Sequence, residues 1–347
     1  MKKGRIVAID TVDERKAAAL LQDGILVDLL VDPINDRPRP HAIYRAKATH
    51  PMKGQNGIIL DLGHGQKGFL KQAKGIAPGT TLLVQVNTHA EAGKAAPVVN
   101  KLLFKSRYAI VTPNAPGINI ARSIRDEDER LRLHEIAHEA FEDAPENCGL
   151  ILRSACEGAD DGDIYANIAA MLQGAITVLN DTTGAPELLL DAPDAAEQAW
   201  ANWGDIDEVI SDNGCFEDLG VWDHIHALER PECTLSGGAS MVIEPTRALI
   251  AVDVNTGADF SLSAGLKANI ATAKDLPRQL RLRGLGGQIV VDFAPSPKAE
   301  RSTIETQLRR AFKADGIDTI LVGWTSLGHY ELQRKRERLP LSEVLQT

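Results

Sequence analysis

Residues 250–255 read IAVDVN and residues 288–292 read QIVVD, and these two stretches decide the fold of the C-terminal part of the chain. Both are rich in β-branched residues and break into small or turn-forming residues, which is typical of buried strands. Each ends near an aspartate, Asp253 or Asp292. A charge at the end of a buried strand is costly unless it is paired or bound to a cation.

The period of a strand places the side chains of Asp253 and Asn255 on the same side. If the two strands are neighbours, three oxygen donors from Asp253, Asn255 and Asp292 converge on one spot. Such a set suits Mg2+, with Mn2+ as the alternative ion, and suits zinc poorly. The competing interpretation is that each aspartate only caps a turn or a helix.

The composition is that of a globular protein of several subdomains. The 347 residues are 44% hydrophobic, 25% charged and 4% aromatic, with a formal net charge of -10. This acidity argues against a non-specific nucleic-acid coat but allows a local basic strip. No stretch reaches the roughly 18 apolar residues of a membrane span, so we expect no membrane association. The four cysteines lack CxxC spacing and predict reduced thiols in a cytoplasmic protein.

Outward from the two central stretches, the pattern predicts short strands, a small barrel and several helices. Strands are expected at 5–9, 16–21, 25–31 and 149–153, a barrel within 41–103, and helices at 126–142, 164–179 and 191–204. A proline-rich joint covers 32–40. A long helix runs between the central strands and ends at residues 278–283, and Pro277 inside it predicts a kink.

Two motifs are weighed against structural explanations. Residues 63–68 match G-x-G-x-x-G, but Gly75 and Pro78 leave no room for the helix that a dinucleotide site needs, so a barrel hairpin explains them better. His134 and His138 match H-E-x-x-H on a helix, which raises the hypothesis of a zinc protease. No third zinc ligand stands out, and a charged surface helix is the alternative.

A third motif, Arg153-Ser154, follows a predicted strand. A guanidinium beside a hydroxyl can grip a terminal phosphate. The alternative is that Arg153 pairs with one of the acids at 160, 161 or 163.

Four runs together resemble the catalytic region of the ribonuclease E/G family: LSGG at 235–238, IEPT at 243–246, VDVN at 252–255 and RQLRLRGLGGQIVVDF at 278–293. Upstream, AIYRAK at 42–47 and the stretch 57–70 resemble the family's RNA-binding barrel, and ILRSA at 151–155 resembles its 5′-end sensor. Gly328, Glu331, Arg334 and Arg336 resemble the segment after its last catalytic strand. The likeness covers nearly the whole chain.

The resemblance implies an α/β fold in five parts. These are an RNase-H-like part (1–36), an OB-fold barrel of the S1 type (37–105), a 5′-sensor subdomain (106–183), a second RNase-H-like part (184–231) and a DNase-I-like catalytic subdomain (232–347). It also implies a Mg2+-dependent endoribonuclease that cuts AU-rich single-stranded RNA in processing or decay. The expected products carry a 5′-phosphate and a 3′-hydroxyl.

By the same resemblance, Asp253, Asn255 and Asp292 hold the metal and are catalytic. RNA contacts are expected from Phe69 and Lys94, and from Arg278, Arg281 and Arg283 unless these pair with neighbouring acids. The expected 5′-phosphate contacts are Arg153, Ser154, Arg130, Gly117 and Ile118.

The sequence also departs from the family pattern. Ile59 stands where a second barrel aromatic is usual, Ser154 replaces threonine, and the segment 316–318 lacks an arginine that helps the sensor. The zinc-sharing CxxC of larger members has no counterpart before Thr347. We therefore expect no zinc and no zinc-linked tetramer, and a monomer or weak homodimer instead. The alternative function is a non-catalytic RNA-binding protein on the same scaffold.

Overall fold

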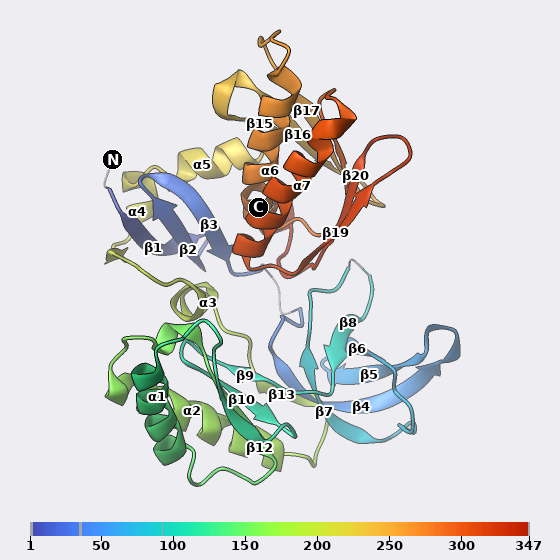
Figure 1. Cartoon of the computed structure of the whole chain (residues 1–347). Coiled ribbons are helices and arrows are strands. Elements are labelled where there is room, and N and C mark those ends of the chain that lie inside the picture. Colours follow the sequence, from blue (N-terminus) through green and yellow to red (C-terminus); the bar gives the residue numbers. More distant parts are fainter. Residues whose placement is uncertain (1–2, 35–36, 92, 346–347) are drawn as a thin grey trace. The chain divides into compact units, whose positions relative to one another are not determined.

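The fold is described from a computed structural model, which covers residues 3–34, 37–91 and 93–345 (Figure 1). The chain forms two compact units. The first combines Met1–Ile34 with Ile206–Thr347, and the second is Asn35–Asp205. Asn35 and Asp36, and with them the predicted boundary at 36, lie outside the described residues.

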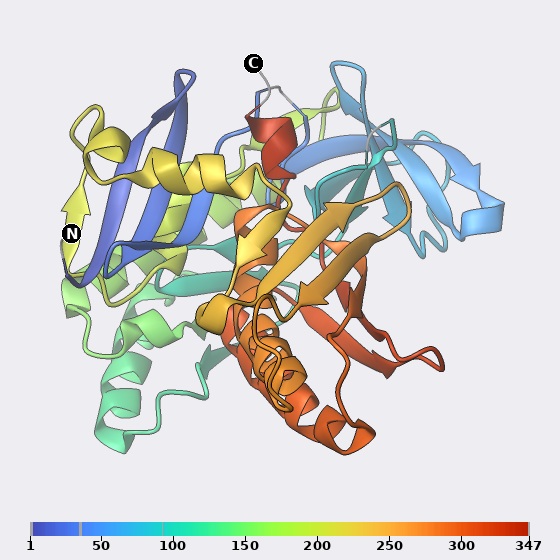
Figure 2. The same ribbon diagram turned by 90° about the horizontal axis from the view of Figure 1, so that it is seen from above.

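The first unit contains a small sheet of order β14-β1-β2-β3. Its strands are β1 (Arg5–Val12), β2 (Arg15–Gln22), β3 (Ile25–Val31) and β14 (Glu208–Ile210). The helices α4 (Cys215–Asp218) and α5 (Val221–Leu228) follow β14, and their residues Phe216, Val221 and Ile225 share one core with the strands. Figure 2 shows the yellow helical segment crossing this blue sheet.

The second sheet of this unit has the order β15-β16-β17-β18-β20-β19. Its strands are β15 (Glu232–Thr234), β16 (Ser240–Pro245), β17 (Ile250–Asn255), β18 (Gly287–Asp292), β19 (Thr319–Trp324) and β20 (Tyr330–Arg334). A crossover helix, α6 (Ala264–Leu282), links the parallel strands β17 and β18, and it packs beside α7 (Arg301–Asp315) (Figure 1). Short 3-10 turns lie at Ser236–Gly238 and Lys298–Glu300, and α8 spans Leu341–Val344.

The second unit contains a closed five-stranded barrel, consistent with an OB fold of the S1 type. The strand order β4-β5-β6-β8-β7 closes because β7 also pairs with β4, and β13 adds to β4 from outside. The bounds are β4 (Ile43–Met52), β5 (Gly57–Gly63), β6 (Gln66–Lys71), β7 (Thr81–Val86), β8 (Ala96–Val99) and β13 (Glu187–Leu190), with a 3-10 turn at Lys53–Gln55. Closure removes free strand edges.

A four-stranded sheet of order β11-β12-β10-β9 completes this unit. It comprises β9 (Phe104–Lys105), β10 (Ala109–Pro113), β11 (Gly117–Ile120) and β12 (Cys148–Leu152), with a 3-10 turn at Ser154–Cys156. The helices α1 (Glu127–Ala140) and α2 (Asp161–Asn180) share its core, and α3 (Ala195–Asn202) follows β13.

Most predicted elements are confirmed, and their ends have local causes. The side chain of Asp126 accepts a hydrogen bond from the backbone of Glu129 and starts α1, and Asp194 starts α3 with a capping box. The hairpin prediction for residues 63–68 is also confirmed, because β5 and β6 meet at His64-Gly65, both with positive φ. Helix α6 runs through Pro277 as one continuous element.

The division into five named subdomains stays a prediction.

Two further findings concern the whole of the described chain. All four cysteines are buried and unpaired, as the spacing predicted. Within residues 3–34, 37–91 and 93–345, no helix combines the length and the apolar character needed to cross a membrane.

Candidate active site

The two aspartates that open the sequence analysis lie side by side. Strand β17 runs parallel to β18 in a register that places Asp253 opposite Asp292. Adjacent strands are about 4.8 Å apart, and directly paired residues of parallel strands point to the same face. In β17 the buried residues are Ile250, Val252 and Val254, which leaves Asp253 on the other, exposed face of the sheet.

Two more polar side chains meet this pair. Asn255 donates a hydrogen bond from Nδ2 to Oδ2 of Asp253 at 2.9 Å. His329 faces the second carboxylate, with Nε2 3.8 Å from Oδ1 of Asp292. His329 comes from the turn that joins β19 to β20, and sequence reasoning missed it. In the sequence, the only feature that could have marked His329 is its place directly before the segment that forms β20, the strand that pairs with β18.

The donor set fits a hard divalent cation. Two like charges on directly opposed positions destabilise a sheet, and a bound cation removes that cost. Within the residues that the structure describes, no cluster of three or more His, Cys, Asp or Glu is placed to hold a metal. The third oxygen donor predicted beside Asp253 and Asp292 is the side-chain amide of Asn255, and its metal role stays a prediction. Carboxylate and amide oxygens are ligands that Mg2+ accepts, with water completing its shell.

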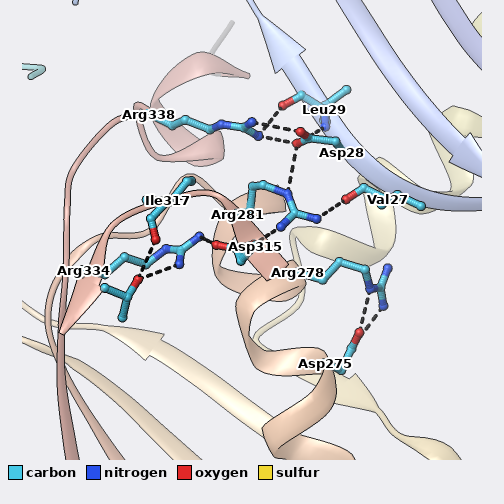
Figure 3. A network of polar contacts seen from close by, with 11 residues as sticks. Val27, Asp28, Leu29, Asp275, Arg278, Arg281, Asp315, Ile317, Arg334 and Arg338 are labelled. Carbon is cyan, nitrogen blue, oxygen red and sulfur yellow. Dashed lines mark hydrogen bonds and ion pairs between the residues drawn. The ribbon is translucent and has the colours of Figure 1, made fainter. Parts of the chain in front are cut away.

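Two of the three arginines predicted to follow the RNA, Arg278 and Arg281, are engaged inside the first unit (Figure 3). Arg278 binds both carboxylate oxygens of Asp275 and the carbonyl of Leu26. Arg281 pairs with Asp28 and Asp315 and donates to the carbonyl of Val27. For Arg281 these contacts are the alternative that the sequence left open, pairing with acids on neighbouring elements, whereas Arg278 pairs with an acid of its own helix.

Arg283 shows the same behaviour. It is 7% exposed and donates to Gln279 and to the backbone carbonyl of Arg230. Burial lowers the pKa of both Arg281 and Arg283 without removing their charge at neutral pH. The guanidinium groups of Arg281 and Arg283 therefore already have hydrogen-bond partners inside the first unit, and their role in RNA binding stays a prediction.

Two further arginines complete this ion-pair network. Arg334 is 2% exposed and donates to Asp315 at 2.5 Å and to Thr319 at 3.0 Å. Arg338 binds both oxygens of Asp28. Burial lowers the pKa of Arg334 to about 10, so it remains protonated at neutral pH. We call this set, Asp28, Arg281, Asp315, Arg334 and Arg338, the arginine network. It joins β3 to α6, α7 and β20.

On the barrel, the predicted RNA contacts come from adjacent strands. Phe69 in β6 pairs with Ile59 in β5, and its ring covers Gly57 so closely that a Cβ there would lie 2.5 Å from the ring. Lys94 is exposed and forms an ion pair with Glu91 at 2.5 Å. A pocket of about 630 Å3 lies beside Lys94, and Arg37, Gln66, Lys67 and Glu91 also line it.

The five residues predicted for the 5′-phosphate come from several elements: Gly117 and Ile118 from β11, Arg130 from α1, and Arg153 and Ser154 from the segment that follows β12. Strand register places Gly117 opposite Gly149 and Ile118 opposite Leu150, the middle residue of β12, whereas Arg153 and Ser154 follow the end of that strand. About four residues of strand, or roughly 13 Å, separate the two groups.

The two arginines of this set are also engaged. Arg153 donates to the carbonyls of Ser106, Arg107 and Ala201 and to the side chain of Asn202. Burial lowers its pKa. Arg130 donates to the carbonyl of Ile124 at 3.1 Å. The partners of Arg153 in these contacts are thus backbone carbonyls and an amide, not the acids at 160, 161 or 163 that the alternative interpretation named. The role of Arg153 in binding a 5′-phosphate stays a prediction.

The H-E-x-x-H histidines lie on one face of α1, as the spacing predicted. The ring centroids of His134 and His138 are 4.6 Å apart, and both side chains are exposed.

Comparisons with known proteins agree with this architecture. The model of the family described as "Ribonuclease E/G family" matches residues 104–214 and 204–337. Ribonuclease G of Escherichia coli (strain K12) is 25% identical to this chain over an alignment 402 residues long. The alignment covers 97% of this chain and 81% of that protein. Ribonuclease E of the same strain is 26% identical over 98% of this chain but only 37% of its own length, and ribonuclease E of Buchnera aphidicola is 25% identical over 41% of its length. The chain belongs to the ribonuclease E/G family.

Proposed function

We propose that this chain is a Mg2+-dependent endoribonuclease that cleaves single-stranded RNA in RNA processing or decay. The observation that carries the proposal is the registered pair Asp253 and Asp292 on adjacent parallel strands, with Asn255 on the same face. Membership of a ribonuclease family, whose members depend on Mg2+, supports it.

The exposed face of the sheet gives an RNA strand access to these carboxylates. Asp253, Asn255 and Asp292 would hold the ion, and His329 would orient the carboxylate of Asp292 that it faces. A Mg2+ ion held by these residues would supply Lewis-acid polarisation of the scissile phosphate and would make water a better nucleophile. Attack of water on phosphorus with departure of the 3′-oxygen gives the proposed 5′-phosphate and 3′-hydroxyl ends.

The barrel would bind the single-stranded RNA. Phe69 offers one face for base stacking, and Lys94 offers a charge for a phosphate. The preference for AU-rich unpaired RNA belongs to the same proposal, as does a monomeric or weakly dimeric state.

The test is cleavage of a fluorescent, AU-rich single-stranded RNA with Mg2+ or with EDTA. We expect cutting only with Mg2+ and a loss of at least a hundredfold in Asp253→Asn and in Asp292→Asn, because the charge stabilisation by the ion is worth several kcal/mol. Asp318→Asn is the matched control, since this exposed carboxylate precedes β19 at the opposite end of the sheet.

Metal binding has its own readout. At ten times its dissociation constant Mg2+ should stabilise the wild type by about 1.4 kcal/mol, visible as a rise in melting temperature that both Asp variants lack. RNA binding without any cutting in the wild type would favour the alternative, a non-catalytic RNA-binding protein. Cutting that persists in both variants would refute the site.

A further inference from the structure

Three large apolar side chains are almost fully exposed. Among the described residues, the most exposed large hydrophobic side chains are Leu262 at 107%, Phe260 at 94% and Leu327 at 84%. The next most exposed, Leu131 and Trp200, reach 62%. Isolated exposed apolar residues are common on protein surfaces. Whether these three form a binding surface therefore depends on where they lie in the fold.

All three lie at the end of the sheet that carries the aspartates. Phe260 and Leu262 belong to the loop of residues 256–263, which leaves β17 directly after Asn255. Leu327 lies in the turn between β19 and β20. Because Tyr330 at the start of β20 pairs with Val291, this turn sits next to the end of β18, where Asp292 lies.

The loop that carries Phe260 is held in place by its own contacts. Asp259 accepts hydrogen bonds from the backbone of Ser261 at 2.8 Å and from Nζ of Lys267 at 3.0 Å. The Ser261 N–H and hydroxyl, with Lys267, keep the pKa of Asp259 at about 2, so this carboxylate is charged at neutral pH. At Gly257 a Cβ would lie only 2.1 Å from the carbonyl oxygen of Gly238, so the loop base needs glycine there.

An anchored loop that presents a bare aromatic ring is suited to contact a flat partner. Phe260 is the fifth residue after Asn255, a span of at most about 17 Å, so the ring lies within a few nucleotides of the proposed cut. The turn at 325–329 also lies beside a cation, because Arg301 covers the ring of Trp324 at 4.4 Å and its Nη2 would lie 3.3 Å from a Cβ at Gly328. A ring together with a cation matches the stacking surface and charge that bind single strands.

We propose that Phe260 is a stacking platform for a nucleobase of the single-stranded RNA next to the scissile phosphate, flanked by Leu262 and Leu327. This inference rests on the proposed function. A ring at position 260 would also supply a second stacking surface for RNA, which the barrel lacks opposite Phe69 because Ile59 stands there instead of an aromatic residue. Stacking tolerates any base, because every base has a π-face.

The first experiment measures binding without cleavage. In the Asp292→Asn background, the affinity for a short single-stranded RNA is compared among Phe260, Phe260→Ala, Phe260→Leu and Phe260→Tyr by fluorescence anisotropy. We expect about tenfold weaker binding for Phe260→Ala, within the range measured for lost stacking, and nearly the same loss for Phe260→Leu. Phe260→Tyr should restore binding, because it restores the ring. The aromatic control is Tyr165→Ala, an exposed ring on α2, and it should change nothing.

The second experiment locates the base. A 2-aminopurine is moved along the RNA one position at a time, and its fluorescence should be quenched at one position near the cut with Phe260 and Phe260→Tyr but not with Phe260→Leu. An abasic residue at that position should make wild-type and Phe260→Ala affinities equal.

The outcomes separate this inference from the proposed function. If wild-type protein cleaves RNA with Mg2+ while Phe260→Ala and Phe260→Leu bind and cut normally, the stacking platform is wrong and the nuclease stands. Equal binding together with a change of molecular mass in Phe260→Ala would assign the loop to self-association and also overturn it. If the wild type does not cleave RNA but Phe260→Ala and Phe260→Leu weaken its RNA binding, the stacking platform stands and the nuclease proposal is wrong.

Discussion

The carboxylate pair and the arginine network are two charged clusters of the same unit, and they differ in what surrounds them. Asp253 and Asp292 are exposed, and two negative charges occupy facing positions. In the arginine network, Asp28 and Asp315 are buried between guanidinium groups from β20, α6 and the segment after β20 (Figure 3). Uncompensated exposed charge points to a ligand, whereas compensated buried charge points to stability.

The sharpest way to break this comparison is to remove one charge from each cluster. Arg334→Met should destabilise the protein by about 4 kcal/mol in urea denaturation, because Asp315 loses a buried partner. Asp292→Asn should leave the free energy of unfolding nearly unchanged. The side chain of Asp292 is 64% exposed, and the substitution removes the repulsion between the carboxylates of Asp253 and Asp292.

The double variant Arg334→Met with Asp315→Leu provides the control. Replacing both members of a buried pair by apolar residues costs less than the sum of the single losses. Additive losses would contradict a structural ion pair.

The second prediction extends the comparison to Arg153. Because its guanidinium donates to three backbone carbonyls, Arg153→Ala should destabilise the protein by about 2 kcal/mol. The same contacts predict that the wild type cleaves 5′-monophosphorylated and 5′-triphosphorylated RNA at rates within about twofold of each other. A large advantage of the monophosphate that Arg153→Ala abolishes would instead establish this arginine as a 5′-phosphate contact.

The third prediction concerns the salt dependence of RNA binding and has the smallest effect. Lys94→Gln should reduce the slope of log affinity against log salt by about 0.7, the value for one phosphate contact to a single strand. Arg281→Gln should leave the slope unchanged, because Arg281 is occupied by Asp28 and Asp315. Equal changes of this slope in both variants would instead indicate that Arg281 contacts an RNA phosphate.

Local patterns predicted the parts of this protein whose signal is local. Alternation along residues 250–255 predicted which side chains share a face, and capping by Asp126 and Asp194 explains where α1 and α3 begin. The glycines at 63–68 predicted a hairpin. The metal-site hypothesis for Asp253 and Asp292 also came from sequence, but only as a condition, that the two strands are neighbours.

Other properties could not be read from local pattern. A run of arginines at 278–283 looks the same whether it faces RNA or buried acids, and the acids that bind it, Asp28 and Asp315, lie far away in the chain. The separation of Gly117 from Arg153 depends on the parallel register of β11 with β12. His329 gains meaning only where its turn meets Asp292.

The sequence alone therefore determined the strands, the helices, the barrel and the identity of the candidate ligands, because these depend on periodicity and on side-chain chemistry. The tertiary structure alone decided which charges are neutralised. Whether an ionised side chain serves stability or a ligand depends on the dielectric and the partners around it, and residues distant in the chain supply both.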